Sequence, residues 1–269
     1  MLAFFIEESN CTFVQEGDTN LNLGLEGKTV LVTGAAKGIG RAIATAIAEE
    51  GGNIALHYQT SEKEALETAN VIEKLGVKVA LVKGDLASIE DVQAMKKTIE
   101  KQLGNVHSIV NNAAWTQYKS FFKYEPGEWT REVDVCFYGV LHLAHTFMPD
   151  MMNSNEGKLI NIIGDSARTG DRNLIISGAA RSGATSFLKS LSQEVGRYNI
   201  QCNTVSLGVI DQGQEFDAVM LEKILKQYPL KRLGNAGDIQ GIILFLLSSW
   251  SDWITGQVIS VNGGQSMMG

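Results

Sequence analysis

The chain has 269 residues, of which 44% are hydrophobic and 20% charged, and 28 glycines stand against 3 prolines. This composition excludes disordered and collagen-like chains and fits one or two globular domains. The formal net charge is −7, and no block of like charges stands out. We therefore expect binding neither to nucleic acid nor to an anionic membrane surface. No apolar run is long enough to span a membrane.

Cysteine usage indicates the compartment. Cys11, Cys136 and Cys202 are widely spaced and have no partner at metal-ligand spacing. The sequence therefore predicts no disulfide framework and no metal site, and it favours a reducing, cytoplasmic compartment. The short apolar start runs directly into Glu7 and lacks the cationic beginning and long apolar stretch of a signal peptide.

After a polar segment that ends near residue 24, short β-rich apolar runs alternate with longer helical patterns. The expected strands are residues 28–33, 53–58, 77–83, 108–112, 158–163, 201–206 and 258–261. One helical pattern opens at Ser61 with a capping-box sequence. This alternation predicts an α/β fold, a doubly wound parallel sheet of about seven strands with helices on both faces. We expect a single domain over 25–269, preceded by an extension over 1–24 that is either a tail or an arm on a neighbour.

A glycine-rich segment follows the first expected strand, and a helical run begins after it. Glycines permit a tight turn and close backbone approach, and the free N–H groups at a helix start attract a pyrophosphate. A plain strand-to-helix turn is the alternative. The position of the segment favours a dinucleotide site that includes Gly34, Ala36, Lys37, Gly38, Ile39 and Gly40.

The spacing Gly-x-x-x-Gly-x-Gly differs from the common dinucleotide fingerprint and resembles that of the short-chain dehydrogenase/reductase family. Further segments fit this family in order over residues 25–269. They are Leu25-Glu26-Gly27-Lys28, Asp85-Leu86, Asn111-Asn112-Ala113-Ala114, Pro229-Leu230-Lys231-Arg232-Leu233-Gly234, Ile254-Thr255-Gly256-Gln257 and Val261-Asn262-Gly263-Gly264. The resemblance implies a Rossmann-like fold and a homo-oligomer, expected to be a tetramer. It also implies a nicotinamide cofactor held by Tyr58, Ser61, Asp85, Leu86, Asn112, Ala113, Ala114, Arg181, Gly208 and Ile210.

Charge favours NADP(H) as the cofactor. An NAD site usually places an acid on the ribose 2′-hydroxyl at the end of the second strand, but residues 57–61 offer none. Lys37 adds a cation where this family binds a 2′-phosphate, which an ammonium attracts. A solvated surface lysine is the alternative.

The family's carbonyl-reducing apparatus is missing from the sequence. In this family a Ser, a Tyr, a Lys four residues later and an Asn on an earlier helix carry the reaction. Here these positions hold Gly164, Ser177, Arg181 and Cys136, respectively. A serine hydroxyl is too weak an acid to replace a phenol, and a guanidinium stays protonated in proteins.

A hydride acceptor that needs no proton would suit such a site. A ketone becomes an alkoxide and requires an acid, whereas an iminium ion becomes a neutral amine. Asp165, at the carboxyl end of the fifth strand, is expected to stabilise that cation, with Arg131 as a second polar participant. Alternatively, Asp165 caps a turn or pairs with Arg168, and Arg131 is a solvated helix residue. An NADP-binding pseudoenzyme and a carbonyl reductase with a replacement acid remain open as alternative functions.

The retained NADP loop, the lost tetrad and Asp165 together resemble the fungal NADPH-dependent reductase/Diels-Alderases of prenylated indole alkaloid biosynthesis, the malbrancheamide and paraherquamide type. This resemblance implies reduction of a cationic, prenylated, dipeptide-derived heterocycle. It also implies a stereoselective intramolecular [4+2] cycloaddition, which requires mainly that diene and alkene be held together. The expected substrate pocket contains Trp115, Cys136, Gly164, Ser166 and Ser177.

Overall fold

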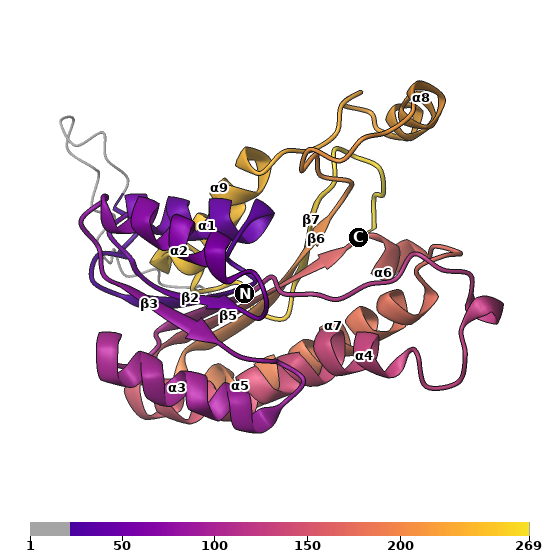
Figure 1. Ribbon diagram of the computed structural model, residues 1–269. Coiled ribbons are helices and arrows are strands. Elements are labelled where there is room, and N and C mark those ends of the chain that lie inside the picture. Colours follow the sequence, from indigo (N-terminus) through magenta and orange to yellow (C-terminus); the bar gives the residue numbers. More distant parts are fainter. Residues whose placement is uncertain (1–21, 269) are drawn as a thin grey trace, which may run out of the picture.

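The computed structural model describes residues 22–268 (Figure 1). Within this range the strands are β1 (Thr29–Thr33), β2 (Asn53–Tyr58), β3 (Val79–Lys83), β4 (Ser108–Asn111), β5 (Gly157–Gly164), β6 (Ile200–Leu207) and β7 (Val258–Val261). The α-helices are α1 (Gly38–Glu49), α2 (Glu62–Glu73), α3 (Ile89–Leu103), α4 (Thr130–Val133), α5 (Gly139–Ser154), α6 (Ser166–Thr169), α7 (Ile175–Val195), α8 (Ala218–Gln227) and α9 (Gly237–Leu247). Short 3₁₀ helices are η1 (Phe121–Lys123), η3 (Gly196–Tyr198) and η4 (Ser249–Ser251), and η2 (Asp134–Tyr138) is a π-helical segment.

All seven strands pair in parallel, in the order β3-β2-β1-β4-β5-β6-β7. The predicted doubly wound sheet is therefore confirmed. The strand order changes direction between β1 and β4, whose last residues, Thr33 and Asn111, are register partners. Open α/β sheets bind ligands outside the carboxyl ends of the strands at such a point.

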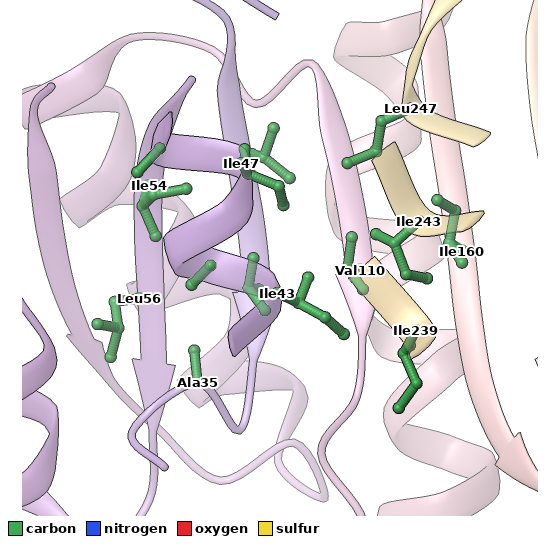
Figure 2. Packing of buried hydrophobic residues seen from close by; sticks show 14 of the residues in the cluster. Ala35, Ile43, Ile47, Ile54, Leu56, Val110, Ile160, Ile239, Ile243 and Leu247 are labelled. Carbon is green, nitrogen blue, oxygen red and sulfur yellow. The ribbon is translucent and has the colours of Figure 1, made fainter. Parts of the chain in front are cut away.

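Helices cover both faces of the sheet (Figure 1). One apolar cluster joins the sheet to α1, α2 and α9, and a second joins it to α3, α5 and α7. In Figure 2, Ile43 of α1 and Ile243 of α9 lie over Val110 of β4 and Ile160 of β5. Burial on both faces explains why the central strands read as nearly continuous apolar runs in the sequence.

The structure differs from the sequence predictions in two local details. Helix α2 begins after Ser61 as expected, but the Ser61 side chain makes no capping hydrogen bond, so the capping-box prediction is wrong. Ser61 lines a cavity instead. Strand β3 begins at Val79, two residues later than predicted. The extension over 1–24 lies almost wholly outside the described residues. Within residues 22–268, no helix has the length and apolar character needed to cross a bilayer.

Candidate functional site

The glycine-rich loop between β1 and α1 depends on its glycines for distinct reasons. Gly34 and Gly38 have φ values of 62° and 58°, in the left-handed region that side chains rarely adopt. Gly40 has an ordinary φ, but a Cβ atom there would lie 2.6 Å from Asn112 Nδ2 and closer still to the carbonyl oxygen of Gly34. Asn112 Nδ2 also lies 3.2 Å from each of the carbonyl oxygens of Thr33 and Gly34. The loop is therefore packed against both α1 and the end of β4.

A cavity of about 550 Å³ lies at the carboxyl ends of the strands. The structure brings together there most of the residues expected to bind the cofactor, namely Gly34, Ala36, Lys37, Ile39, Tyr58, Ser61, Asp85, Leu86, Asn112, Ala113, Ala114, Arg181, Gly208 and Ile210. Arg131, Trp115 and Gly164 line the same cavity. Gly38 and Gly40 do not line the cavity. They contribute instead to the shape of the glycine-rich loop, as described above. Cys136, Asp165, Ser166 and Ser177 also lie outside the lining.

Sequence reasoning missed several lining residues. These are His57, Gln59, Thr60, Gly84, Val135, Ile162, Ile163, Leu207 and Gln212. Most of them lie at or just beyond the carboxyl ends of predicted strands, so the topology rule alone indicates their location. The hydrogen-bond partners of the His57 ring, in contrast, are Gly34 and Gly84, which lie 23 and 27 residues away in the chain.

The imidazole of His57 ties the glycine-rich loop to the end of β3. His57 is only 2% exposed. The N–H of Gly34 donates to its Nδ1 at 3.1 Å, and its Nε2 lies 3.1 Å from the carbonyl oxygen of Gly84. Because Nδ1 accepts and Nε2 must donate, this arrangement requires the neutral imidazole with its proton on Nε2.

We expect the buried imidazole of His57 to make the free energy of unfolding depend on pH. Burial lowers the pKa of His57 from 6.5 to about 4, although Gly84 and Asp85 oppose the shift. The unfolded chain takes up the proton below pH 6.5, while the folded chain resists it until about pH 4. The stability contribution is therefore complete above pH 6.5 and is lost as the pH falls toward 4, by about 3 kcal/mol in total.

Urea unfolding of wild type and His57→Asn between pH 7.5 and 4 checks this prediction. The difference in the free energy of unfolding between the two proteins should shrink by about 3 kcal/mol over this range. A matched control is His107→Asn, since Nδ1 of His107 likewise accepts a backbone hydrogen bond, from Thr29, at the opposite end of β1. A wild-type advantage over His57→Asn that stays constant with pH would contradict the assignment.

Arg131 and Asp85 form an ion pair on the cavity wall. Nη1 of Arg131 lies 2.6 Å from Oδ2 of Asp85. Burial alone would raise the pKa of Asp85, but hydrogen bonds from Arg131 and from the backbone N–H of Ala87 hold that pKa below its usual value. Asp85 is the only carboxylate among the lining residues. Arg131 is thus paired with Asp85, the residue expected to contact the adenine, and forms no hydrogen bond or ion pair with Asp165.

Asp165 was expected to act on the substrate, but it does not line the cavity. Asp165 follows β5 and is 5% exposed. Its Oδ1 accepts a hydrogen bond from Ser206 Oγ at 2.5 Å, and its Oδ2 accepts from Asn262 Nδ2 at 2.5 Å and Ser266 Oγ at 2.7 Å. The alternative pairing with the Arg168 guanidinium is also absent, because that group binds other partners near the C-terminus. Three donors satisfy the buried carboxylate where it lies.

The four residues expected at the family's tetrad positions lie in or beside the cavity, because Gly164 and Arg181 line it, Ser177 contacts Arg181, and Cys136 contacts Trp115. Nη1 of Arg181 donates to the fully buried Oγ of Ser177 at 3.1 Å. A Cβ atom at Gly164 would meet only Ser166 Oγ, at 3.5 Å. Local packing therefore does not require glycine at position 164, and the missing side chain leaves space beside β5.

The charges of the cavity suit a phosphorylated dinucleotide. Lys37, Arg131 and Arg181 line it against the single carboxylate of Asp85. The start of α1 offers unpaired backbone N–H groups to a pyrophosphate. Gln59, Thr60 and Ser61 follow β2 without an acid, so nothing there repels a 2′-phosphate.

Comparison with known proteins agrees with this geometry. The family model described as enoyl-(acyl carrier protein) reductase matches residues 34–266. The chain is 34% identical to the 3-oxoacyl-[acyl-carrier-protein] reductase FabG of Staphylococcus aureus over 245 residues, which cover 89% of this chain and 98% of that protein. It is 30% identical to the protein of the same name from Aquifex aeolicus over 248 residues, covering 91% and 99% of the two chains.

Solved structures show the same architecture. A protein from Sinorhizobium meliloti described as a short-chain alcohol dehydrogenase superposes with a TM-score of 0.85 at 28% identity, covering 90% of this chain and 97% of its own. A protein from Agrobacterium tumefaciens described as a gluconate dehydrogenase gives a TM-score of 0.86 at 25% identity, with coverages of 91% and 98%. With its parallel sheet, glycine-rich loop and cavity, the chain belongs to the short-chain dehydrogenase/reductase family of oxidoreductases.

Proposed function

We propose that the protein is an NADPH-dependent reductase whose hydride acceptor is a cationic imine or iminium ion. The observation that carries the proposal is a cavity that is lined by most of the residues expected to bind the cofactor and that lacks an acid at its Gly164 end. The cavity-lining groups able to exchange a proton are Lys37, His57, Tyr58 and Asp85. His57 and Tyr58 belong to β2, Lys37 follows β1, and Asp85 follows β3.

His57, Tyr58 and Asp85 are not available at the Gly164 end, and we assign Lys37, which follows β1, to the 2′-phosphate of the cofactor. Strands β1 and β4 separate β2 from β5 in the sheet, which corresponds to about 14 Å between β2 and β5. His57 is neutral and uses both ring nitrogens, and Asp85 is paired with Arg131. An acceptor bound beside Gly164 must therefore be reducible without a proton from the protein.

An iminium ion meets this requirement. When bound, NADPH supplies a hydride, and the iminium carbon accepts it while the nitrogen recovers its lone pair. The product is a neutral amine, and no proton moves. Lys37 and the N–H groups of the glycine-rich loop support the choice of NADPH, because they provide positive charge and donors for its phosphates.

Carbonyl reduction is the second candidate, and Arg181 favours it. A guanidinium at the position of the family's lysine can stabilise a developing alkoxide, and the curated relatives are named as 3-oxoacyl-[acyl-carrier-protein] reductases. However, such a product still needs a proton, and Ser177, which Arg181 contacts, is fully buried and too weak an acid to supply it.

The proposal includes a cycloaddition that follows reduction. It rests on the resemblance to the fungal reductase/Diels-Alderases, and the apolar lining supports it. Trp115, Val135, Ile163 and Leu207 provide a wall without charge near Gly164. Such a wall can hold a prenyl alkene against a diene and so lower the entropic part of the barrier. The expected product of a prenylated substrate is a single enantiomer of a bicyclic adduct, measured by chiral chromatography, whereas a racemic adduct would contradict enzymatic control.

A substrate panel tests the reductase proposal. We expect NADPH consumption, followed at the nicotinamide absorbance, with N-methyl-3,4-dihydroisoquinolinium and no consumption with 1-tetralone, a neutral ketone of similar size. The rate with the iminium ion should not fall between pH 6 and pH 9, because no protein acid takes part. Ketone turnover that falls as the pH rises would instead identify carbonyl reduction. NADPH binding without consumption by either compound would identify a pseudoenzyme.

A further inference from the structure

Two residues at the lost tetrad positions now hold the loop that follows β4. Sγ of Cys136, in η2, donates to the carbonyl oxygen of Trp115 at 3.3 Å. Nη2 of Arg181, in α7, donates to Oγ1 of Thr116 at 2.9 Å. Residues that would serve carbonyl chemistry in other members of the family therefore bind two consecutive loop residues here.

A third contact fixes the same segment. The backbone N–H of Gln117 donates to Oε1 of Glu132 at 2.9 Å. Glu132 belongs to α4 and is fully buried, and its other oxygen accepts a hydrogen bond from the hydroxyl of Tyr124 at 2.8 Å. Residues 115–117 are thus held by α4, η2 and α7 together, which is more than a surface loop ordinarily requires.

The residue that this clamp positions is Trp115. Trp115 lines the cavity, and the residue keeps 38% of its surface exposed. It follows β4, the strand next to β5, so it lies at the end of the cavity that contains Gly164. The other aromatic lining residues, His57 and Tyr58, belong to β2.

A cationic acceptor needs an attractive partner at this end of the cavity. The lining carboxylate of Asp85 is neutralised by Arg131, and Asp165 is absent from the lining. The guanidinium of Arg181 repels a neighbouring cation, so the partner must offset that repulsion. The face of an indole carries negative electrostatic potential and attracts cations.

Resting on the reductase function proposed above, we propose that Trp115 is the acceptor-binding residue, and that its indole holds a flat, ring-shaped cation through a cation–π contact. Cys136 and Arg181 are positioning residues, because they act through the backbone of Trp115 and the side chain of Thr116. This assignment gives the substrate class as planar cyclic iminium ions, with an apolar substituent facing the apolar wall.

Calorimetric titration of the NADP⁺ complex tests the assignment independently of turnover, because the oxidised cofactor cannot donate a hydride. The probes are N-methyl-3,4-dihydroisoquinolinium and neutral 1-tetralone. The variants are Trp115→Phe, which keeps a π face, and Trp115→Leu, which removes it. Trp253→Leu is the matched control, because Trp253 is fully exposed and does not line the cavity.

We expect Trp115→Leu to weaken binding of the cation at least about tenfold, a change of about 1.4 kcal/mol. Trp115→Phe should weaken it less than about threefold, and Trp253→Leu should leave it unchanged. Binding of 1-tetralone should change less than about threefold in all three variants. Cys136→Val, which removes the S–H donor, should weaken cation binding, and Cys136→Ser, which keeps a donor, should largely restore it.

Three results would overturn the assignment. They are unchanged cation binding by Trp115→Leu, an equal loss of the cation and the ketone, and a wild-type complex that does not bind the cation. Failure of the proposed reductase function gives a different result. In that case Trp115 would still select the cation in the NADP⁺ complex, while the NADPH complex would bind the cation without consuming NADPH.

Discussion

Replacing Gly40 with alanine is expected to weaken NADPH binding by at least about 100-fold, equivalent to about 2.7 kcal/mol. The added Cβ atom would lie 2.6 Å from Asn112 Nδ2 and closer still to the carbonyl oxygen of Gly34. The Gly34 oxygen is a backbone atom, so relief of the clash requires the whole loop to move away from α1. Gly40 does not line the cavity, and the loss of affinity follows entirely from the displaced loop. Fluorescence titration of NADPH measures the effect.

Gly241→Ala is the matched control, since Gly241 also lies inside a helix but a Cβ atom there meets nothing within 4 Å. This variant should bind NADPH normally and gain up to about 1 kcal/mol of stability. If Gly40→Ala fails to fold, Gly38→Ala provides a second measurement, because the Cβ atom there meets only the flexible end of Gln212. The φ of 58° at Gly38 makes alanine unfavourable, and we expect about tenfold weaker binding. Wild-type affinity in both variants would contradict the role of the loop.

Replacing Asp165 with alanine is expected to lower the free energy of unfolding by at least about 3 kcal/mol. The change leaves the donors of Ser206, Asn262 and Ser266 without their shared acceptor in a buried region. An unpaired buried donor is costly, and the hydroxyls of Ser206 and Ser266 lose their acceptor, whereas Asn262 Nδ2 keeps the carbonyl oxygen of Ser266 at 2.9 Å. Asp165→Asn should also destabilise the protein, because its amide N–H would face another donor. Urea unfolding at pH 7 measures both changes.

Asp171→Ala is the control for this prediction, because Asp171 is exposed and its carboxylate accepts one local bond, from the N–H of Asn173. Its free energy of unfolding should change by less than about 0.5 kcal/mol. The outcome also separates two roles of Asp165. A variant Asp165→Ala that is as stable as wild type, binds NADPH and cannot turn over the iminium ion would show that the carboxylate acts on the substrate.

The sheet, the glycine-rich loop and, apart from the start of β3, the strand limits to within one residue were predictable from the sequence. Strands buried on both faces give apolar runs that local patterning reveals. The loop can be recognised in the sequence because Gly34, Gly38 and Gly40, which all shape the same turn, lie close together in the chain. Even the missed lining residues of β2 and β6 follow from the rule that ligands bind at strand ends.

The orientation of individual side chains could not be predicted in the same way. The partners of Asp165 come from β6 and from residues 262–266, about forty and one hundred residues away in the chain. The position of Asp165 at the end of β5 was therefore predicted correctly from the sequence. The direction in which its carboxylate points was not. Similarly, the resemblance to the family suggests that Cys136 and Arg181 replace catalytic residues, but only the three-dimensional structure shows that they bind the segment around Trp115.

Transfer of deuterium from [4,4-²H₂]NADPH to N-methyl-3,4-dihydroisoquinolinium tests most directly whether this protein reduces an acceptor without a protein acid. We expect one deuterium at C1 of N-methyl-1,2,3,4-tetrahydroisoquinoline, detected by NMR, at a rate that stays constant between pH 6 and pH 9. Deuterium on the carbinol carbon of reduced 1-tetralone, with none in the amine, would contradict it.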